Sequence, residues 1–103
     1  MAQFDVYTND NVATRSHIPY LVDIQSDLLE SLATRVVIPL VRQTDVKSVK
    51  TLMPIVALDG QHYVLLTPQL AGVQSRILKQ RVGSMSEYRG EIVKAMDLLV
   101  TGI

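Results

Sequence analysis

MPIVALDGQHYVLL, residues 53–66, is the stretch that decides the fold of this chain. Two apolar runs flank the dipeptide Asp59-Gly60, which suits a two-residue type I′ turn because both central residues of that turn need a positive φ angle. Apolar runs joined by such a turn are typical of paired antiparallel strands. Residues 53–66 are therefore predicted to form a β-hairpin.

Two further strand-like segments lie near the start of the chain. Residues 3–8 alternate apolar and polar side chains, with Phe4 and Val6 on the apolar side, as a half-buried strand does. Residues 19–24 are mostly apolar, and Pro19 is tolerated because it stands at the beginning of the segment. The polar residues between the two segments are predicted to form a loop.

The segment before the hairpin predicts a third strand. Residues 34–41 are rich in β-branched side chains. Pro39 removes one donor from the hydrogen-bond ladder, which indicates an edge, a bulge or a bend at that position. Capping residues precede several leucines in residues 26–33, so one helical turn or a compact loop is expected there. Residues 43–52 are polar and are predicted to form a surface loop.

Weaker signals follow the hairpin. In TPQLAGV, residues 67–73, a proline follows the first threonine, and this order predicts a single helical turn. Residues 74–82 are predicted to form a further strand. Gly83 is expected to break that strand.

The last part of the chain changes its apolar period from two to 3.6 residues. Ser84 and Glu87 have the spacing of a capping box, which marks the start of a helix. Gly102 stands where a left-handed C-terminal cap is expected. The apolar residues that recur at spacings of three and four, and so predict one amphipathic helix, are Tyr88, Ile92, Ala95, Met96, Leu99 and Ile103.

Together these segments predict a mainly β fold with a C-terminal α-helix. About five or six short strands followed by one helix fit a small antiparallel barrel, or a strongly bent sheet, with the helix packed on it. No repeat, low-complexity tract or linker divides the chain. Residues 1–103 are therefore expected to form a single domain.

The composition excludes several classes of function. The chain has 10 basic and 10 acidic residues, and zero formal charge argues against binding nucleic acid by neutralising many phosphates. It has no cysteine, which removes disulfides, thiolate nucleophiles and thiolate metal sites. No segment approaches the roughly 20 apolar residues that cross a bilayer, and no signal-peptide pattern is present. We therefore expect a cytoplasmic protein with no membrane partner.

Individual side chains offer little catalytic chemistry. His17 and His62 lack a ligand spacing such as HExxH, so no metal or other cofactor is expected. Ser26 between Asp23 and Asp27 permits a nucleophile hypothesis, but no GxSxG motif is present and a capping role is favoured. Spacing alone does not decide whether the two carboxylates form an acid–base or metal-binding pair. The arginines are scattered and are expected to form ordinary ion pairs. Because the sequence shows no catalytic constellation, a binding protein is favoured over an enzyme.

Several segments resemble the CcdB family of bacterial toxins, in the same order over nearly the whole chain. They are QFDVYT (3–8), VDIQSDLL (22–29), TRVVIPL (34–40), the start of the hairpin, LLTPQLAGV (65–73) and the C-terminal Gly-Ile. The resemblance implies an SH3-like barrel, shared with the MazF ribonucleases, and a homodimer.

The resemblance also implies a function and partners. CcdB-like toxins bind the A subunit of DNA gyrase and trap the enzyme on cleaved DNA, without catalysing a reaction themselves. A CcdA-like antitoxin neutralises them, and the toxin–antitoxin complex represses its own operon. DNA is contacted only indirectly, through the antitoxin, which agrees with the neutral charge of this chain.

Carried over position by position, the resemblance implies a gyrase-binding surface on the helix and on one loop. Its members are Gly90, Lys94, Asp97, Thr101, Gly102 and Ile103 on the helix, and Ser26, Leu28 and Leu29 in the loop. The family members best known for gyrase poisoning carry tryptophan where this chain has Thr101. Threonine cannot make the stacking contact with a partner's arginine that an aromatic ring makes. Gly90 stands mid-helix, where it costs about 1 kcal/mol relative to alanine, and close approach by another backbone or neutral drift would explain it.

Two other functions remain as alternatives. A MazF-like endoribonuclease would use the same fold, since fold does not fix function, but it needs a basic groove and a positioned acid–base pair. A degenerate homologue would act only as a decoy for the antitoxin. The scattered arginines favour the gyrase inhibitor over the ribonuclease.

Overall fold

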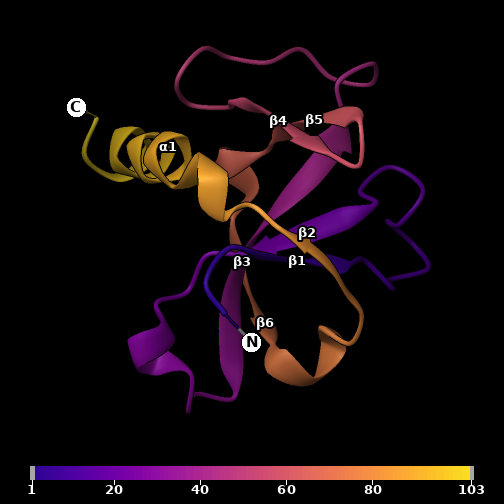
Figure 1. The fold of residues 1–103 in the computed structure, drawn as a ribbon, viewed down its shortest axis with the longest axis vertical. Coiled ribbons are helices and arrows are strands. Elements are labelled where there is room, and N and C mark those ends of the chain that lie inside the picture. The colour runs from indigo at the N-terminus through magenta and orange to yellow at the C-terminus, as the bar shows by residue number, and fades with distance from the viewer. Residues whose placement is uncertain (1, 103) are drawn as a thin grey trace.

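The computed structural model describes residues 2–102, which form one antiparallel sheet with a helix packed on it (Figure 1). In chain order the strands are β1 (Asp5–Thr8), β2 (Tyr20–Asp23), β3 (Thr34–Arg42), β4 (Ile55–Leu58), β5 (Gln61–Leu65), β6 (Ala71–Gln74) and β7 (Arg81–Ser84). Their order across the sheet is β4-β5-β3-β2-β1-β7, and β6 pairs with β3. The sheet curls into a half-barrel. The predicted class, mainly β with an SH3-like antiparallel barrel and a C-terminal helix, is confirmed.

β3 is the central strand of the sheet. It pairs with β2 along one side, and along the other its first half pairs with β6 and its end pairs with β5. Pro39 lies between these two partners, and its carbonyl accepts a hydrogen bond from the Leu66 N–H at 2.9 Å. The nitrogen of a strand residue faces the same side as its carbonyl. Proline lacks an N–H donor, and this position therefore lies where β3 changes its pairing partner from β6 to β5.

β4 and β5 form the predicted hairpin. Asp59 and Gly60 have φ angles of 50° and 79°, as a type I′ turn requires. Leu58 pairs with Gln61 directly across the turn, and the hairpin prediction is confirmed. A 3₁₀ turn, η2 (Thr67–Gln69), follows at the predicted proline, but it is shorter than predicted because β6 begins soon after it.

The two ends of the sheet approach each other through side chains. A Cβ atom built on Gly83 of β7 would lie 2.9 Å from the Cδ1 atom of Leu58 in β4. Gly83 therefore permits a close approach between the end strands. The prediction that it breaks a strand is wrong, because it pairs with Val6 inside β7.

A 3₁₀ turn, η3 (Ser75–Ile77), separates β6 from β7. The continuous strand predicted over residues 74–82 is therefore wrong. The turn changes the direction of the chain and brings Leu78 against Tyr7 and Val37 on the outer face of the sheet. Burial of Leu78 provides the physical reason for the interruption.

The outer face of β1 is also covered. Asp5 and Tyr7 are 7% and 4% exposed. Leu78 packs on Tyr7, and Arg81 forms an ion pair with Asp5 at 3.0 Å. The strand predicted at residues 3–8 is confirmed as β1, but the prediction that only one of its faces is buried is wrong.

The helix α1 (Arg89–Thr101) follows a 3₁₀ turn, η4 (Ser86–Tyr88). The predicted capping box is wrong: the Ser84 hydroxyl accepts a hydrogen bond from the amide two residues on, and α1 begins later, without a side-chain cap among the described residues. The Tyr88 hydroxyl accepts a hydrogen bond from the Ala57 N–H at 3.0 Å and joins the start of α1 to β4. None of the described helices is long and apolar enough to span a membrane.

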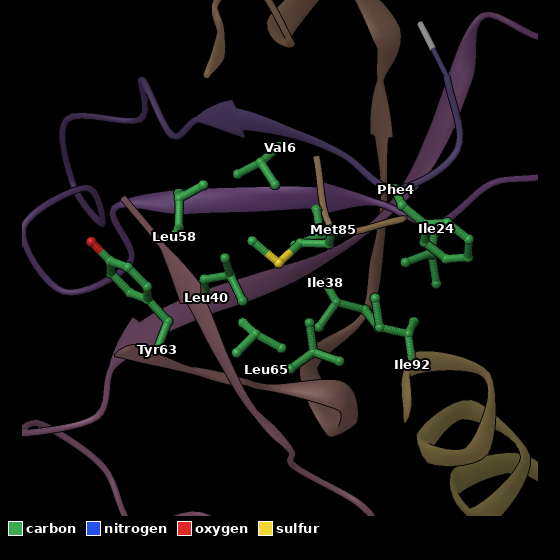
Figure 2. Packing of buried hydrophobic residues seen from close by; sticks show 12 residues of the cluster. Phe4, Val6, Ile24, Ile38, Leu40, Leu58, Tyr63, Leu65, Met85 and Ile92 are labelled. Carbon is green, nitrogen blue, oxygen red and sulfur yellow. The ribbon is translucent and has the colours of Figure 1, made fainter. Parts of the chain in front are cut away.

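The main hydrophobic core fills the inside of the curled sheet (Figure 2). Alternate strand residues point into it, and Ile92 reaches it from α1. In Figure 2, Met85 extends toward Leu40 and Leu58 from the segment that precedes the helix. The buried members of this core are Phe4, Val6, Val22, Ile24, Ile38, Leu40, Val56, Leu58, Tyr63, Leu65, Met85 and Ile92.

Candidate functional site

Four of the predicted site residues form one stripe along α1, which we call the helix stripe. Gly90, Lys94, Asp97 and Thr101 follow one another at spacings of four, three and four, so they lie on the same face of the helix. All four are exposed. The helix therefore presents these residues to solvent rather than to the core.

The last turn of α1 extends beyond the main core, on which Met96 still packs. The buried residues of the helix, Ile92 and Ala95, lie no further along than its middle. After them, Met96 and Leu99 are only half-buried, and Val100 is 77% exposed. In Figure 1 the helix runs outward from the sheet, and its C-terminal end lies at the rim of the molecule.

The charges and the glycine of the helix stripe have no partner within the described part of the chain. Lys94 and Asp97 take part in no ion pair between described residues. A Cβ atom on Gly90 would have no neighbour within 4 Å. Close approach by another segment of residues 2–102 therefore does not explain this glycine.

The end of α1 has a fixed backbone. The Thr101 hydroxyl donates a hydrogen bond to the Asp97 carbonyl at 2.6 Å, so this side chain turns back along its own helix. Gly102 has a φ angle of 74°, and its N–H bonds to the Leu98 carbonyl at 3.0 Å, as predicted for a left-handed cap. The predicted site residue Ile103 lies outside the described residues.

The predicted loop residues surround a 3₁₀ turn, η1 (Asp27–Leu29). The Ser26 hydroxyl accepts a hydrogen bond from the Leu28 N–H at 3.2 Å, which confirms the capping role. Leu28 is 92% exposed and Leu29 is 48% exposed. Two consecutive exposed leucines are typical of a surface that contacts another protein.

This loop is separate from the end of α1 within one chain. In Figure 1 the turn η1, the small purple coil at the lower left, lies well away from the yellow end of the helix. Gln3 connects the loop instead to the start of α1: its N–H donates to Asp27 Oδ1 at 2.7 Å, and its Oε1 accepts from Arg89 Nη1 at 3.4 Å. The two parts of the predicted surface do not form one continuous patch in a single copy.

A buried ion pair lies next to the loop. Arg35 Nη2 is 2.6 Å from Asp23 Oδ2, and the two side chains are 1% and 0% exposed. Asp23 Oδ1 also accepts a hydrogen bond from the Gln25 N–H at 3.0 Å. Because Asp23 binds Arg35 while Asp27 binds the Gln3 N–H, the two carboxylates do not form the acid–base or metal-binding pair that their spacing allowed.

Gln25 joins the loop to the sheet. Its Nε2 donates to the Leu29 carbonyl at 2.9 Å, and its Oε1 accepts from the Val36 N–H at 3.2 Å. The Arg35 Nη1 atom beside it is buried and has no hydrogen-bond partner among the described residues. The position of the exposed leucines thus depends on a buried polar cluster of Asp23, Gln25 and Arg35.

Ion pairing is rarer than predicted. Among the described residues, the arginines that form ion pairs are Arg35, with Asp23, and Arg81, with Asp5. The expectation that the scattered arginines pair in general is therefore wrong. No group of three or more potential metal ligands occurs among residues 2–102, and His17 and His62 lie in separate parts of the chain.

Two tyrosines have perturbed titration. Burial raises the pKa of Tyr7, and the carboxylates of Asp5 and Asp23 raise it further. Burial also raises the pKa of Tyr63, and the neighbouring Tyr20 raises it further. The two rings meet edge to face, with their centroids 5.4 Å apart. Both tyrosines are packed structural groups.

Three features of the surface were not predicted from the sequence. Gln3 and Arg89 connect the loop to the helix through contacts between distant segments, and no local pattern signals them. The third feature is the exposed Val100. Its exposure could have been predicted, because this residue lies outside the predicted apolar stripe of the helix.

A family model supports the assignment of the whole chain. The model described as CcdB protein matches residues 3–102, which include the loop and all described residues of the helix stripe. The family is one of gyrase inhibitors rather than catalysts, and membership implies partnering with an antitoxin. The chain therefore belongs to the CcdB family, the toxins of ccd toxin–antitoxin systems.

Proposed function

We propose that this toxin binds the A subunit of DNA gyrase through the exposed end of α1 and traps the complex of gyrase with cleaved DNA. The observation that carries the proposal is the exposed helix stripe, which ends at Thr101, next to the left-handed cap at Gly102. The stripe, together with Gly102, Ile103, Ser26, Leu28 and Leu29, is the proposed contact surface.

Charge on the helix stripe supports a protein partner. Lys94 and Asp97 are exposed and have no ion-pair partner among the described residues. Charges of this kind fix the register of a protein complex and speed its formation. Since Thr101 offers no aromatic ring, these two charges take over part of the contact that tryptophan makes in other family members.

A second copy of the chain completes the surface. Val100 leaves apolar area exposed beside the helix stripe, and Leu99 on the other side of α1 is only half-buried. A twofold axis between two copies brings the same patch of each chain together. The homodimer would then present two helix ends to one gyrase molecule.

The proposed toxin inhibits without catalysis. Side chains that were candidates for chemistry have structural partners: Ser26 caps η1, and Asp23 binds Arg35. Their hydrogen bonds support a role for this protein as a binding inhibitor rather than as a MazF-like ribonuclease.

The proposal includes control by a partner. A CcdA-like antitoxin neutralises the toxin, and the two together repress their operon, with DNA bound through the antitoxin. Equal numbers of acidic and basic residues in the toxin agree with this division of roles. Because gyrase acts on the chromosome in the cytoplasm, the toxin acts there too.

Gyrase, supercoiled plasmid and the purified chain test the proposal directly. The wild-type chain should produce trapped, cleaved plasmid, and deletion of Gly102 and Ile103 should abolish trapping while changing the free energy of unfolding by less than about 1 kcal/mol. The reversal K94E/D97K should weaken trapping, whereas the matched reversal D45K/K47E in the exposed loop should not. Retained trapping by the truncated chain, or RNA cleavage without gyrase, contradicts the proposal.

A further inference from the structure

A hollow of about 550 Å³ lies on a part of the surface that the proposed function does not use. One wall is the segment that follows β1, with Asn9, Asp10 and Asn11, and the other is η3 and the residues after it, with Arg76 and Lys79. No residue of α1 or of the 26–29 loop lines it. Its volume lies within the range of small-molecule sites, about 300–1,000 Å³.

The wall after β1 is held in place by its own side chains. Asn9 is only 9% exposed, and its Nδ2 donates to Thr14 Oγ1 at 3.0 Å and to the Ile18 carbonyl at 2.8 Å. Its Oδ1 accepts the Asn11 N–H at 3.1 Å. This wall of the hollow is therefore formed before any ligand arrives, which reduces the ordering cost of binding.

The opposite wall carries two cations with spare hydrogen-bond donors. Arg76 donates through Nε to Gln74 Oε1, which leaves its two terminal nitrogens without a partner among the described residues. Lys79 likewise makes no hydrogen bond or ion pair within residues 2–102. An anionic group placed in the hollow can accept charge-assisted hydrogen bonds from both side chains.

The remaining lining adds an apolar surface and an acceptor. Leu21 and the 44% exposed Ile77 supply apolar area. Asp10 accepts the Thr8 hydroxyl through Oδ1 at 3.0 Å, and its Oδ2 has no hydrogen-bond donor among the described residues. A ligand that fits this lining has an anionic group, an apolar face and a hydrogen-bond donor.

We propose that the hollow binds a small organic phosphate of the nucleoside monophosphate class. The phosphate is held by Arg76 and Lys79, the apolar face of the base lies on Leu21 and Ile77, and a hydroxyl or amino group donates to Asp10. A long polyanion such as RNA fits less well, because the chain has zero net charge. Binding here is independent of gyrase, so the proposal does not rest on the proposed function.

Nuclear magnetic resonance titration of the ¹⁵N-labelled full chain tests the proposal with three probes: adenosine 5′-monophosphate, adenosine and inorganic phosphate. The monophosphate should shift the amide resonances of residues 8–11 and 76–79 in a saturable way. Adenosine and phosphate should each bind at least about tenfold more weakly, because each makes only part of the contacts.

Matched variants separate a specific site from general attraction between charges. R76A/K79A should bind the monophosphate at least about tenfold more weakly, whereas K47A/K50A, which removes the same charge from an exposed loop, should bind as the wild type does. Each variant's amide spectrum verifies its fold. Three results overturn the proposal: no shift in the hollow, equal binding of inorganic phosphate, or equal losses in both double variants.

Discussion

The buried pair of Asp23 and Arg35 allows a prediction whose size follows from the structure. Asp23→Asn keeps the shape of the side chain but leaves the Arg35 guanidinium buried without a counter-charge, and its Nη1 already lacks a partner among the described residues. Arg35→Met leaves the Asp23 carboxylate with the Gln25 N–H as its remaining buried partner. Both variants should lose stability because each leaves one uncompensated charge in the interior.

The expected loss is large for a domain of this size. Removing one member of a buried ion pair costs about 3–5 kcal/mol, whereas the whole free energy of unfolding of a small domain is about 5–15 kcal/mol. The double variant D23N/R35M removes both charges and keeps an amide oxygen at position 23 as acceptor for the buried Gln25 N–H. It should therefore recover much of the loss, since no uncompensated charge stays buried.

Urea unfolding followed by circular dichroism measures these differences, at one fixed protein concentration because the stability of an oligomer depends on it. Arg15→Ala is the control, since Arg15 is exposed and forms no ion pair among the described residues, and such a surface change alters stability by only about 0.5 kcal/mol. Single variants that lose less than about 1 kcal/mol, or a double variant as unstable as the sum of the singles, would refute the reasoning.

Three further predictions concern packing, binding and pH. Gly83→Ala should destabilise the fold by about 1–3 kcal/mol because the new methyl group meets Leu58, whereas Gly72→Ala enters open space and should change stability by less than about 1 kcal/mol; thermal unfolding compares the two. Thr101→Trp should strengthen binding to the gyrase A subunit by about 0.5–2 kcal/mol in titration calorimetry, because the ring can stack on an arginine. Burial raises the pKa of Tyr7 in the folded chain, so its contribution to stability is complete below pH about 10 and is lost as the pH rises through the folded pKa; Tyr7→Phe should flatten that alkaline decline in urea titrations.

Each of these predictions has a contradicting result. Equal unfolding temperatures for the two glycine variants would show that the Leu58 contact is not tight. Unchanged or weaker binding by Thr101→Trp would show that the helix end does not face an arginine of gyrase. An alkaline decline of the same steepness in Tyr7→Phe would assign that decline to other groups.

The parts of the fold that follow from neighbouring residues were predictable. Asp59-Gly60 specifies its turn through backbone angles that few other dipeptides adopt, and Gly102 specifies the helix end in the same way. Pro39 marked an irregularity in β3, and the strand does change partner there. In each case the physical cause lies within a few residues of the signal.

The parts that depend on distant contacts were not predictable. The sequence pattern predicts a break at Gly83, but glycine is needed there because Leu58, 25 positions earlier in the sequence, approaches it from the other end of the sheet. The turn at Ser75–Ile77 has no glycine or proline to mark it and forms so that Leu78 can cover Tyr7. The pairing of Asp23 with Arg35 likewise joins two strands, and no spacing rule connects them.

The candidate site also has a part that was predictable from neighbouring residues and a part that depends on distant contacts. Helical periodicity was sufficient to place Gly90, Lys94 and Asp97 on the polar side of the helix, and all three are exposed. The same periodicity says nothing about the 26–29 loop, which lies well away from the helix end (Figure 1). The link through Gln3 to the start of α1 also appears only in three dimensions.

Hydrogen exchange of the full chain, alone and mixed with the gyrase A subunit, addresses the identity of the contact surface most directly. If the end of α1 is that surface, amides of residues 94–102 should exchange more slowly in the mixture, together with those of residues 26–29. Slower exchange confined to other elements, with the end of α1 unchanged, would contradict the account.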